Sequence, residues 1–323
     1  MKYRKLGKTD VEVSEISLGC WTMGGLNWVN GTPNGWANVD EKEISEAINY
    51  ALDKGVNHFD NADVYGNGRA ERMLARILGE RTNNFIIATK IGWFPGTAEH
   101  AYEPKHIRHQ CEQSLINLKR EYIDIYYFHH GDFGENDKYL DDAIEVMYKL
   151  REEGKIRLIG QSAYRHEDFV KLIPKVKPDV IQSMASALDD SFVKDDSPTR
   201  KMLDEYNVSF VAFGPVAQGL LLGKYHQGNP PQFEAGDHRA NAPRFNPENL
   251  AKLEHKIEML KTKFGSSNQE LSRAALQYLL YYKQVGAVIP GFRNLDQVKS
   301  NLAGSDNSLT EEEFKFMQKV FTD

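Results

Sequence analysis

Short runs of β-branched and aromatic residues alternate along this chain with longer segments in which apolar residues recur every three or four positions. The short runs are typical of buried strands, and the longer segments are typical of helices with one apolar face. Eight strands are predicted, at residues 15–19, 57–62, 85–92, 122–129, 156–162, 179–185, 208–214 and 286–291. Because strand and helix alternate strictly, the pattern favours a parallel sheet, and eight strand-helix units are the number that closes a barrel.

The helices between these strands begin at residues that favour a helix start. Asp40 followed by Glu43 resembles a capping box, and apolar residues between positions 44 and 52 then form one stripe. Glu103 and Pro104 open a second helix. Four more helices are predicted, at residues 139–150, 165–172, 199–206 and 269–282.

Two stretches lie outside the repeat. Residues 2–14 predict a short β-hairpin, and residues 224–247 form a Gly-, Pro- and Asn-rich loop of the kind that usually covers a functional site. The predicted fold is therefore α/β, a (β/α)8 TIM barrel with an N-terminal β-hairpin, with residues 1–323 as a single domain. A doubly wound sheet also alternates in this way, but its glycine-rich fingerprint should open the first helix, whereas Gly66 and Gly68 follow the second strand.

Composition and charge exclude several classes of function. A chain of 323 residues with 41% hydrophobic and 27% charged residues can bury a large core. Cys20 and Cys111 are too few for a disulfide framework and lack a C-x-x-C spacing, so we expect no disulfide and no metal site. A net charge of −6 with scattered Lys and Arg gives no attraction for nucleic acid. Because the sequence shows neither a leader-like segment nor a long apolar run, we expect a cytoplasmic protein without a membrane partner.

Four polar residues stand at or just after the ends of three successive predicted strands. Asp60 ends one strand and Tyr65 follows in the next turn, while Lys90 and His129 end the two strands after it. In a barrel, the carboxyl ends of the strands meet at the catalytic face. We therefore expect these four side chains to lie together at one mouth.

This set of side chains suits carbonyl reduction, in which a hydride reaches the carbon while an acid protonates the oxygen. Tyrosine, with an ordinary pKa of about 10, is a proton donor at neutral pH. A neighbouring Lys90 ammonium would stabilise the Tyr65 phenolate, and Asp60 would keep Lys90 charged. His129 would hydrogen-bond the substrate oxygen and orient it.

Each member of the set also has a structural explanation of its own. Asp60 could be a helix cap, Tyr65 a packed aromatic and Lys90 half of a structural ion pair. His129 is followed by His130, and one of two adjacent histidines is commonly a packing residue. The joint pattern is a stronger indication of chemistry than any member alone.

The segments that carry these residues resemble the aldo-keto reductase family. FDNADVYG at 59–66 is similar to the family's F-D-T-A-x-x-Y-G, with Asn61 in place of Thr, and ATK at 88–90 also matches. YIDIYYFH at 122–129 is similar to the family's Y-[IL]-D-L-Y-x-x-H and selects His129 rather than His130. The resemblance covers essentially the whole chain and implies a barrel closed by an N-terminal hairpin. It also implies Tyr65 as the acid, Lys90 and Asp60 as its tuning pair, and His129 as the residue that orients the substrate.

The resemblance also implies a nicotinamide cofactor. Ser162 and Gln182 would hold its carboxamide, Phe213 would stack on the nicotinamide, and Arg293 would bind a 2′-phosphate, which favours NADPH/NADP+ over NADH. The chain departs from the usual pattern at Ala163 and Gly214, where Asn and Ser are common. The cofactor residues implied are Trp21, Thr22, Asp60, Ser162, Gln182, Phe213, Gly214, Pro215, Val216, Gln218, Gly219, Leu220, Lys224, Gly291, Arg293, Gln297 and Asn301.

Aromatic residues after the strands are the candidates for contact with the substrate. Trp21, Tyr65, Trp93 and His129 are expected to contact it, with Phe94 beside them. Trp28 and Trp36 lie in an insertion that forms either one wall of the pocket or ordinary loop packing. Asp132 and the loop at 236–239 resemble the sugar- and aldehyde-reducing branches of the family.

The sequence thus predicts an NADPH-dependent carbonyl reductase that acts on a small aldehyde, ketone or sugar. Two alternatives stay open. One is a Schiff-base aldolase with Lys90 as its nucleophile, which leaves the cofactor series unexplained. The other is a cofactor-binding regulatory module with negligible turnover, like the channel-associated members of the family. The sequence leaves the physiological substrate, the reaction direction and the oligomeric state open.

Overall fold

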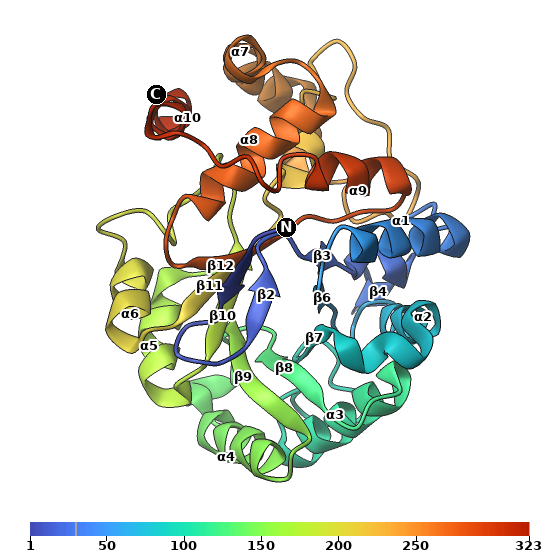
Figure 1. Ribbon diagram of the computed structural model, residues 1–323. Coiled ribbons are helices and arrows are strands. Elements are labelled where there is room, and N and C mark those ends of the chain that lie inside the picture. Colours follow the sequence, from blue (N-terminus) through green and yellow to red (C-terminus); the bar gives the residue numbers. More distant parts are fainter. Residues whose placement is uncertain (30, 323) are drawn as a thin grey trace.

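Eight parallel strands form one sheet that curves into a barrel in the computed structural model, which describes residues 1–29 and 31–322 (Figure 1). The sheet order is β3-β6-β7-β8-β9-β10-β11-β12. The strands are β3 (Leu18–Gly19), β6 (His58–Asp60), β7 (Ile86–Ile91), β8 (Ile123–Phe128), β9 (Ile156–Ser162), β10 (Val180–Met184), β11 (Ser209–Phe213) and β12 (Val285–Ile289). The ladder closes between its two ends, because Ser17 N–H donates to Val288 O and Val288 N–H donates to Glu15 O, both at 2.9 Å. The predicted (β/α)8 barrel is confirmed.

The predicted N-terminal hairpin is also confirmed, and it closes the base of the barrel. Strands β1 (Tyr3–Lys5) and β2 (Glu12–Ser14) pair antiparallel. Leu6 and Val13 of this hairpin are fully buried among residues that point into the barrel, including Tyr127 of β8. Arg4 ties the hairpin to the first residue of β12 and to the segment before it, by donating to Val285 O at 2.8 Å and Leu280 O at 2.7 Å. The open end of the barrel is therefore the one where the strands finish.

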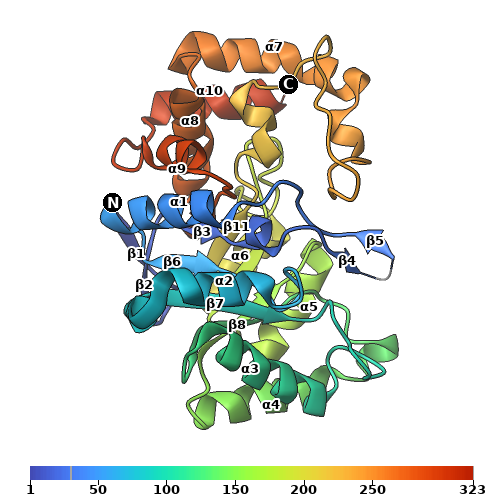
Figure 2. The same ribbon diagram turned by 90° about the vertical axis from the view of Figure 1, so that its right-hand side faces the viewer.

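Helices surround the sheet (Figures 1 and 2). They are α1 (Glu41–Asp53), α2 (Arg69–Leu78), α3 (Pro104–Leu118), α4 (Leu140–Glu152), α5 (His166–Val176), α6 (Pro198–Tyr206), α7 (Pro247–Phe264), α8 (Asn268–Leu280), α9 (Leu295–Leu302) and α10 (Glu311–Thr322). Asp40 caps α1 by accepting the N–H groups of Lys42 and Glu43 at 2.8 and 3.1 Å. A reciprocal capping box occurs at α8, between Ser267 and Glu270. Helices α2, α7, α9 and α10 were not among the predicted ones.

Two segments meet at the open end of the barrel. One follows the 3-10 turn η1 (Trp21–Gly24) and carries the small hairpin β4 (Trp28–Val29) and β5 (Thr32–Pro33). The other is the predicted long loop, which descends from α7 towards that hairpin in Figure 2 and includes the turn η5 (Pro243–Phe245). His238 N–H donates to Gly35 O at 3.0 Å, and Ala37 N–H donates to Asp237 at 3.2 Å. The loop is therefore fixed to the insertion across the mouth.

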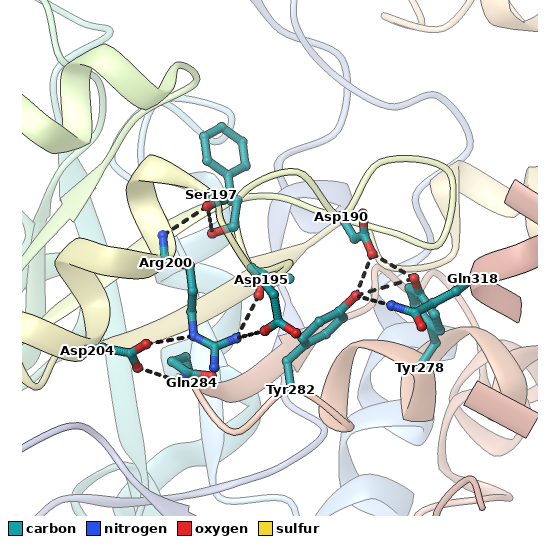
Figure 3. A network of polar contacts seen from close by, with 11 residues as sticks. Asp190, Asp195, Ser197, Arg200, Asp204, Tyr278, Tyr282, Gln284 and Gln318 are labelled. Atoms are coloured by element: carbon teal, nitrogen blue, oxygen red, sulfur yellow. Dashed lines mark hydrogen bonds and ion pairs between the residues drawn. The ribbon is translucent and has the colours of Figure 1, made fainter. Parts of the chain in front are cut away.

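A polar network fastens the last helices to the loop between β10 and α6 (Figure 3). Asp190 of that loop accepts hydrogen bonds from the hydroxyl groups of Tyr278 at 2.6 Å and Tyr282 at 2.5 Å. Gln318 of α10 donates to the Tyr282 hydroxyl at 3.4 Å. The network lies outside the barrel mouth and contributes to the fold. Among the described residues, no helix combines the length and the apolar character needed to cross a bilayer.

Candidate active site

Lys90 lies at the centre of a polar cluster inside the barrel mouth. It is the penultimate residue of β7, and its side chain is fully buried. Its Nζ donates to Asp60 Oδ2 and to Asn61 O, both at 2.7 Å, and to the Tyr65 hydroxyl at 3.4 Å. These contacts use all three N–H groups of an ammonium. The structure thus brings together Asp60, Tyr65 and Lys90 as the sequence predicted.

Asp60 is held from two sides. One carboxylate oxygen accepts the Lys90 ammonium, and the other accepts Gln182 Nε2 at 2.8 Å. Its backbone carbonyl accepts Cys20 N–H at 2.8 Å, which joins β6 to the segment after β3. Asp60 is therefore part of a fixed buried ion pair rather than a helix cap. Gln182, expected to bind the cofactor, also positions this carboxylate.

Tyr65 stands in the turn after β6, and its position depends on a close backbone contact. A Cβ added at Gly24 would lie 2.7 Å from the Tyr65 carbonyl carbon, so glycine lets η1 lie against this turn. Burial raises the pKa of Tyr65 well above its ordinary value, and the Asp60 carboxylate raises it further. The expected stabilisation of the phenolate by Lys90 is therefore outweighed in this state. Tyr65 keeps its proton, and its oxygen accepts from Lys90 while its hydrogen stays available.

His129 joins the same mouth from the end of β8. Its ring centroid lies 6.1 Å from that of Tyr65, at an interplanar angle of 76°. Its Nδ1 is buried without a partner among residues 1–29 and 31–322. Burial lowers the pKa of His129 well below its ordinary value, and the charge of Lys90 lowers it further. The ring is therefore neutral at physiological pH.

Asn61 occupies the position where the resemblance expects Thr. Its Oδ1 accepts Ala62 N–H at 3.0 Å, and its own carbonyl accepts Lys90. Its Nδ2 is buried without a partner in the described part of the chain. Because Lys90 contacts the backbone carbonyl of Asn61, this contact does not depend on whether the side chain is Asn or Thr.

Two carboxyl groups buried behind Lys90 were missed by the sequence reasoning. Glu71 of α2 is fully buried and accepts the Thr89 hydroxyl at 2.7 Å and Asn117 Nδ2 at 2.8 Å. Asp63, in the turn before Tyr65, accepts Val64 N–H at 2.7 Å. Burial raises the pKa of both groups. Glu71 fastens α2 to β7, the strand that carries Lys90. No motif in the sequence around Glu71 indicates this role.

Two of the residues expected at the nicotinamide lie at the ends of strands β9 and β11, on either side of β10. Ser162 ends β9, and its Oγ is buried without a hydrogen-bond partner among the described residues. Phe213 ends β11 and is half-buried, with its ring 6.2 Å from that of Tyr164. An unpartnered hydroxyl and an accessible aromatic face suit a carboxamide and a flat heterocycle.

The expected pyrophosphate segment forms an irregular turn after β11. Gly214, Gln218 and Gly219 have φ values of +69°, +56° and +96°. Pro215, Val216 and Leu220 are buried, so this turn offers backbone groups rather than these side chains to a ligand. It continues as the 3-10 helix η4 (Ala217–Leu222). Such a turn can present several backbone N–H groups to an anion.

Cations gather at the far end of this turn. Lys224 is exposed and Arg293 is half-buried. Partial desolvation and the charge of Arg293 lower the pKa of Lys224. Burial and the nearby Arg239 lower the pKa of Arg293 in turn. Like charges held this closely favour an anion between them. The sequence predicted Lys224 and Arg293 here but did not single out the role of Arg239.

The other residues expected at the adenosine end mainly contact the chain itself. Gln297 Oε1 accepts Arg293 N–H at 2.8 Å. Asn301 Nδ2 donates to Gly291 O at 3.3 Å. The Thr22 hydroxyl donates to the Phe292 carbonyl. These contacts shape the segment that carries Arg293, and the proposed contacts with adenine stay predictions.

One wall of the mouth is built by indole and imidazole rings. Trp21 stacks near Tyr65, with ring centroids 6.0 Å apart, and His238 of the long loop lies 4.3 Å from Trp21. Trp36 lies 4.5 Å from His238 and 5.5 Å from Trp21. Trp36 is thus part of the wall. Trp28, by contrast, is exposed and lies beside Gly236 of the long loop.

The long loop is held against this wall by a buried ion pair. Arg239 binds Asp237 through two hydrogen bonds of 2.8 Å. Its guanidinium carbon lies 4.3 Å from the ring centroids of both Trp36 and Phe233. Hydrogen bonds from Arg239 and its charge lower the pKa of Asp237 to about 2, against the opposing effect of burial. The pair therefore stays ionised at physiological pH.

Comparison with known proteins identifies the family. Residues 15–321 match the model of the Aldo/keto reductase family. This chain belongs to that family. YqkF of Bacillus subtilis, described as an uncharacterized oxidoreductase, is 30% identical, and the match covers 98% of this chain and 96% of YqkF.

Solved structures of aldo-keto reductases match the whole barrel. The holo form of an aldo-keto reductase from Bacillus halodurans has a TM-score of 0.75 and 28% identity, over 99% of this chain and 96% of that one. A glycerol dehydrogenase from Gluconobacter oxydans has a TM-score of 0.79 and 28% identity, over 99% and 95% of the two chains. The predicted resemblance is confirmed. Membership of the aldo/keto reductase family supports an oxidoreductase that acts on carbonyl groups with a nicotinamide cofactor.

Proposed function

We propose that this aldo-keto reductase is an NADPH-dependent carbonyl reductase with Tyr65 as its proton donor. The observation that carries the proposal is the position of the Lys90 ammonium, 3.4 Å from the Tyr65 oxygen and 2.7 Å from the Asp60 carboxylate. The substrate proposed is a small aldehyde, ketone or sugar. The glycerol dehydrogenase among the similar structures supports a small polyhydroxylated compound as one member of that class.

The residues of the site divide the proton chemistry between them. Ser162, Gln182 and Phe213 would hold the nicotinamide ring, and the cofactor, when bound, would be the source of hydride for the carbonyl carbon. Tyr65 gives its phenolic proton to the carbonyl oxygen, and the Lys90 ammonium stabilises the phenolate that remains. Asp60 keeps Lys90 charged and in place. The neutral His129 donates a hydrogen bond to the same oxygen and does not compete as an acid.

The choice of NADPH rests on the cations at the far end of the site. Partial desolvation and the charge of Arg293 lower the pKa of Lys224, while burial and the charge of Arg239 lower the pKa of Arg293. A 2′-phosphate would relieve this repulsion and accept hydrogen bonds from the Arg293 guanidinium. The unpartnered Ser162 hydroxyl and the half-buried Phe213 fit the nicotinamide end of the same molecule.

The Schiff-base aldolase is disfavoured by the surroundings of Lys90. A nucleophilic lysine must lose a proton and reach its substrate. Lys90 is fully buried, and its three N–H groups contact a carboxylate, a carbonyl and a phenol. These contacts stabilise the ammonium rather than the free amine.

A panel of sugars, aliphatic aldehydes and ketones, tested with NADPH and NADH, examines the proposal directly. We expect the absorbance of NADPH to fall with at least one member of the panel. Tight NADPH binding without oxidation by any member would indicate the regulatory module instead. Borohydride trapping of a carbonyl substrate on Lys90 without a cofactor would indicate the aldolase.

A further inference from the structure

The indole of Trp93 projects into the mouth from the loop between β7 and α3. Its ring centroid lies 6.1 Å from that of His129, and 38% of its side chain is exposed. Phe94 and Tyr164 are also exposed. This side of the mouth faces any group attached to the carbonyl carbon of a substrate held at Tyr65 and His129. Its shape therefore depends on where the backbone around Trp93 is fixed.

His130 fixes the backbone immediately before Trp93. Its Nε2 donates to Gly92 O at 2.8 Å, while its Nδ1 accepts Asp132 N–H at 3.2 Å. These two contacts require the neutral tautomer with hydrogen on Nε2. Burial lowers the pKa of His130, which maintains that neutral form. The ring also packs against Trp93, with centroids 4.8 Å apart.

His130 is itself held from several directions. Tyr102 is fully buried, and its hydroxyl lies 2.9 Å from His130 O and 3.0 Å from His130 N. Gln161 Nε2 donates to the same carbonyl at 3.2 Å. His130 is therefore held in a fixed position. Its hydrogen bond to Gly92 O in turn fixes the start of the loop between β7 and α3.

His106 fixes the backbone immediately after Trp93. It stands in the first turn of α3, and its Nε2 donates to Phe94 O at 2.7 Å. Glycines at positions 92 and 96, with φ values of +154° and +60°, flank the segment. Glycine has the widest conformational freedom of any residue, so this segment would be mobile without anchors. The two imidazoles supply an anchor on each side of Trp93.

We propose that His106 and His130 are positioning residues for substrate specificity. By donating to the carbonyls of Phe94 and Gly92, they clamp Trp93 and set the wall that contacts the substrate beyond its carbonyl group. The inference rests on the proposed function, because it assigns that wall to the same reaction. Neither histidine takes part in the proton transfer, which belongs to Tyr65, Lys90 and Asp60. The proposal gives His130 a role beyond packing.

Steady-state kinetics of matched variants test the clamp. His106→Leu and His130→Leu remove the donor, whereas His106→Gln and His130→Gln keep an amide N–H in its place. We expect each Leu variant to raise the KM of the carbonyl substrate about three- to tenfold, the size of one lost hydrogen bond. The Gln variants should recover most of the loss, and kcat and the Kd for NADPH should change less than about twofold. His109→Leu, at an exposed position of the same helix, is the control.

A double-mutant cycle with Trp93→Ala separates the clamp from a general structural role. If the histidines act through the indole, removing either one should change KM little once Trp93 is gone. An unchanged KM in the Leu variants would overturn the proposal. So would an equal rise in KM with and without Trp93.

Hydrogen–deuterium exchange tests the clamp without any turnover. Exchange at residues 92–98 should be faster in His106→Leu and His130→Leu than in wild type, and unchanged in His109→Leu. Equal exchange in all four proteins would overturn the clamp. An enzyme that oxidises no NADPH but shows this difference would contradict the proposed function while supporting the clamp as a structural device.

Discussion

The proposed catalytic centre and the walls of the mouth are built on different parts of the fold. Lys90, Asp60 and His129 stand on or beside strands, where a buried ladder of hydrogen bonds fixes each Cα. Trp21, Trp36, Trp93 and His238 stand on turns and loops that are fixed by a few side-chain contacts. A barrel of this kind can therefore keep the residues proposed for proton transfer unchanged, while changes in its loops alter which substrates bind. Variants in the two regions should therefore fail in different ways.

The largest effect is expected at the centre from Tyr65→Phe. The substitution removes the proton that the proposal transfers to the carbonyl oxygen, so kcat for reduction should fall about a thousandfold or more. The Kd for NADPH should stay within about twofold of wild type. Tyr281→Phe, at an exposed position beside α10 and away from the mouth, should retain nearly full activity. A Tyr65→Phe enzyme with wild-type kcat would remove Tyr65 from its assigned role.

Lys90→Met should lower both kcat and the free energy of unfolding by large amounts. Removing the ammonium leaves the Asp60 carboxylate buried without its partner, at a cost of about 3 kcal/mol or more in the free energy of unfolding. Urea denaturation and kcat measure the two effects. The double variant Asp60→Asn with Lys90→Met should recover stability but not turnover. Recovery of turnover would show that the pair is structural only.

Arg293→Met sharpens the comparison at the cofactor end, where the contact is electrostatic. Loss of the guanidinium should raise the Kd for NADPH about tenfold or more and leave the Kd for NADH nearly unchanged. Fluorescence titration with both cofactors measures the difference. Lys299→Met, in the following helix, is the control. Equal weakening for both cofactors would contradict binding of a 2′-phosphate at Arg293.

Arg239→Met should show the behaviour of a wall residue. Without its guanidinium, Asp237 and Trp36 lose the contact that fixes the long loop, so the KM of the carbonyl substrate should rise severalfold. The melting temperature should fall by only a few degrees, because the barrel core is untouched. Arg244→Met, at an exposed position of the same loop, is the control. A fall in kcat with unchanged KM would place Arg239 with the centre instead.

The smallest effect expected is that of pH on kcat. Tyr65 must be protonated to act, and its raised pKa keeps the proton on as pH rises. His129 must be neutral to act. Because its pKa is lowered, the ring stays neutral even when the pH falls below about 6.5, the ordinary pKa of histidine. The kcat for reduction should therefore be flat from about pH 6 to about pH 9. A titration with a midpoint near pH 7 or 8 would contradict these directions.

The parts of the fold predicted from sequence are those with a local signal. The strands and the residues at their ends follow from short apolar runs, which is why Asp60, Lys90 and His129 were expected at one mouth. Helix α2 was not predicted, because it begins at Gly68 without a capping side chain. Helix α7 has Asn246 as its cap and Pro247 at its start, but these residues were assigned to the end of the long loop.

The parts that could not be predicted depend on contacts between distant segments. Glu71 meets Thr89 and Asn117 only after three elements have packed together. The contact of His106 with Phe94 likewise requires α3 to lie beside the loop before it. The raised pKa of Tyr65 is a property of burial, which a motif does not encode. Sequence therefore indicated the reacting groups better than the groups that position them.

The contacts that close the barrel join residues made early in synthesis to residues made much later. The proposed ligand site depends on these contacts. Ser17 and Val288 bond across the closure, and beside them the Thr22 hydroxyl reaches the Phe292 carbonyl, 270 positions later in the chain. Strand β3 therefore finds its last neighbour only after the chain has been made as far as Val288. Arg293 follows directly, so the proposed phosphate contact forms only once both edges of the sheet have been made. Binding of NADPH would then report that the two edges of the barrel have come together.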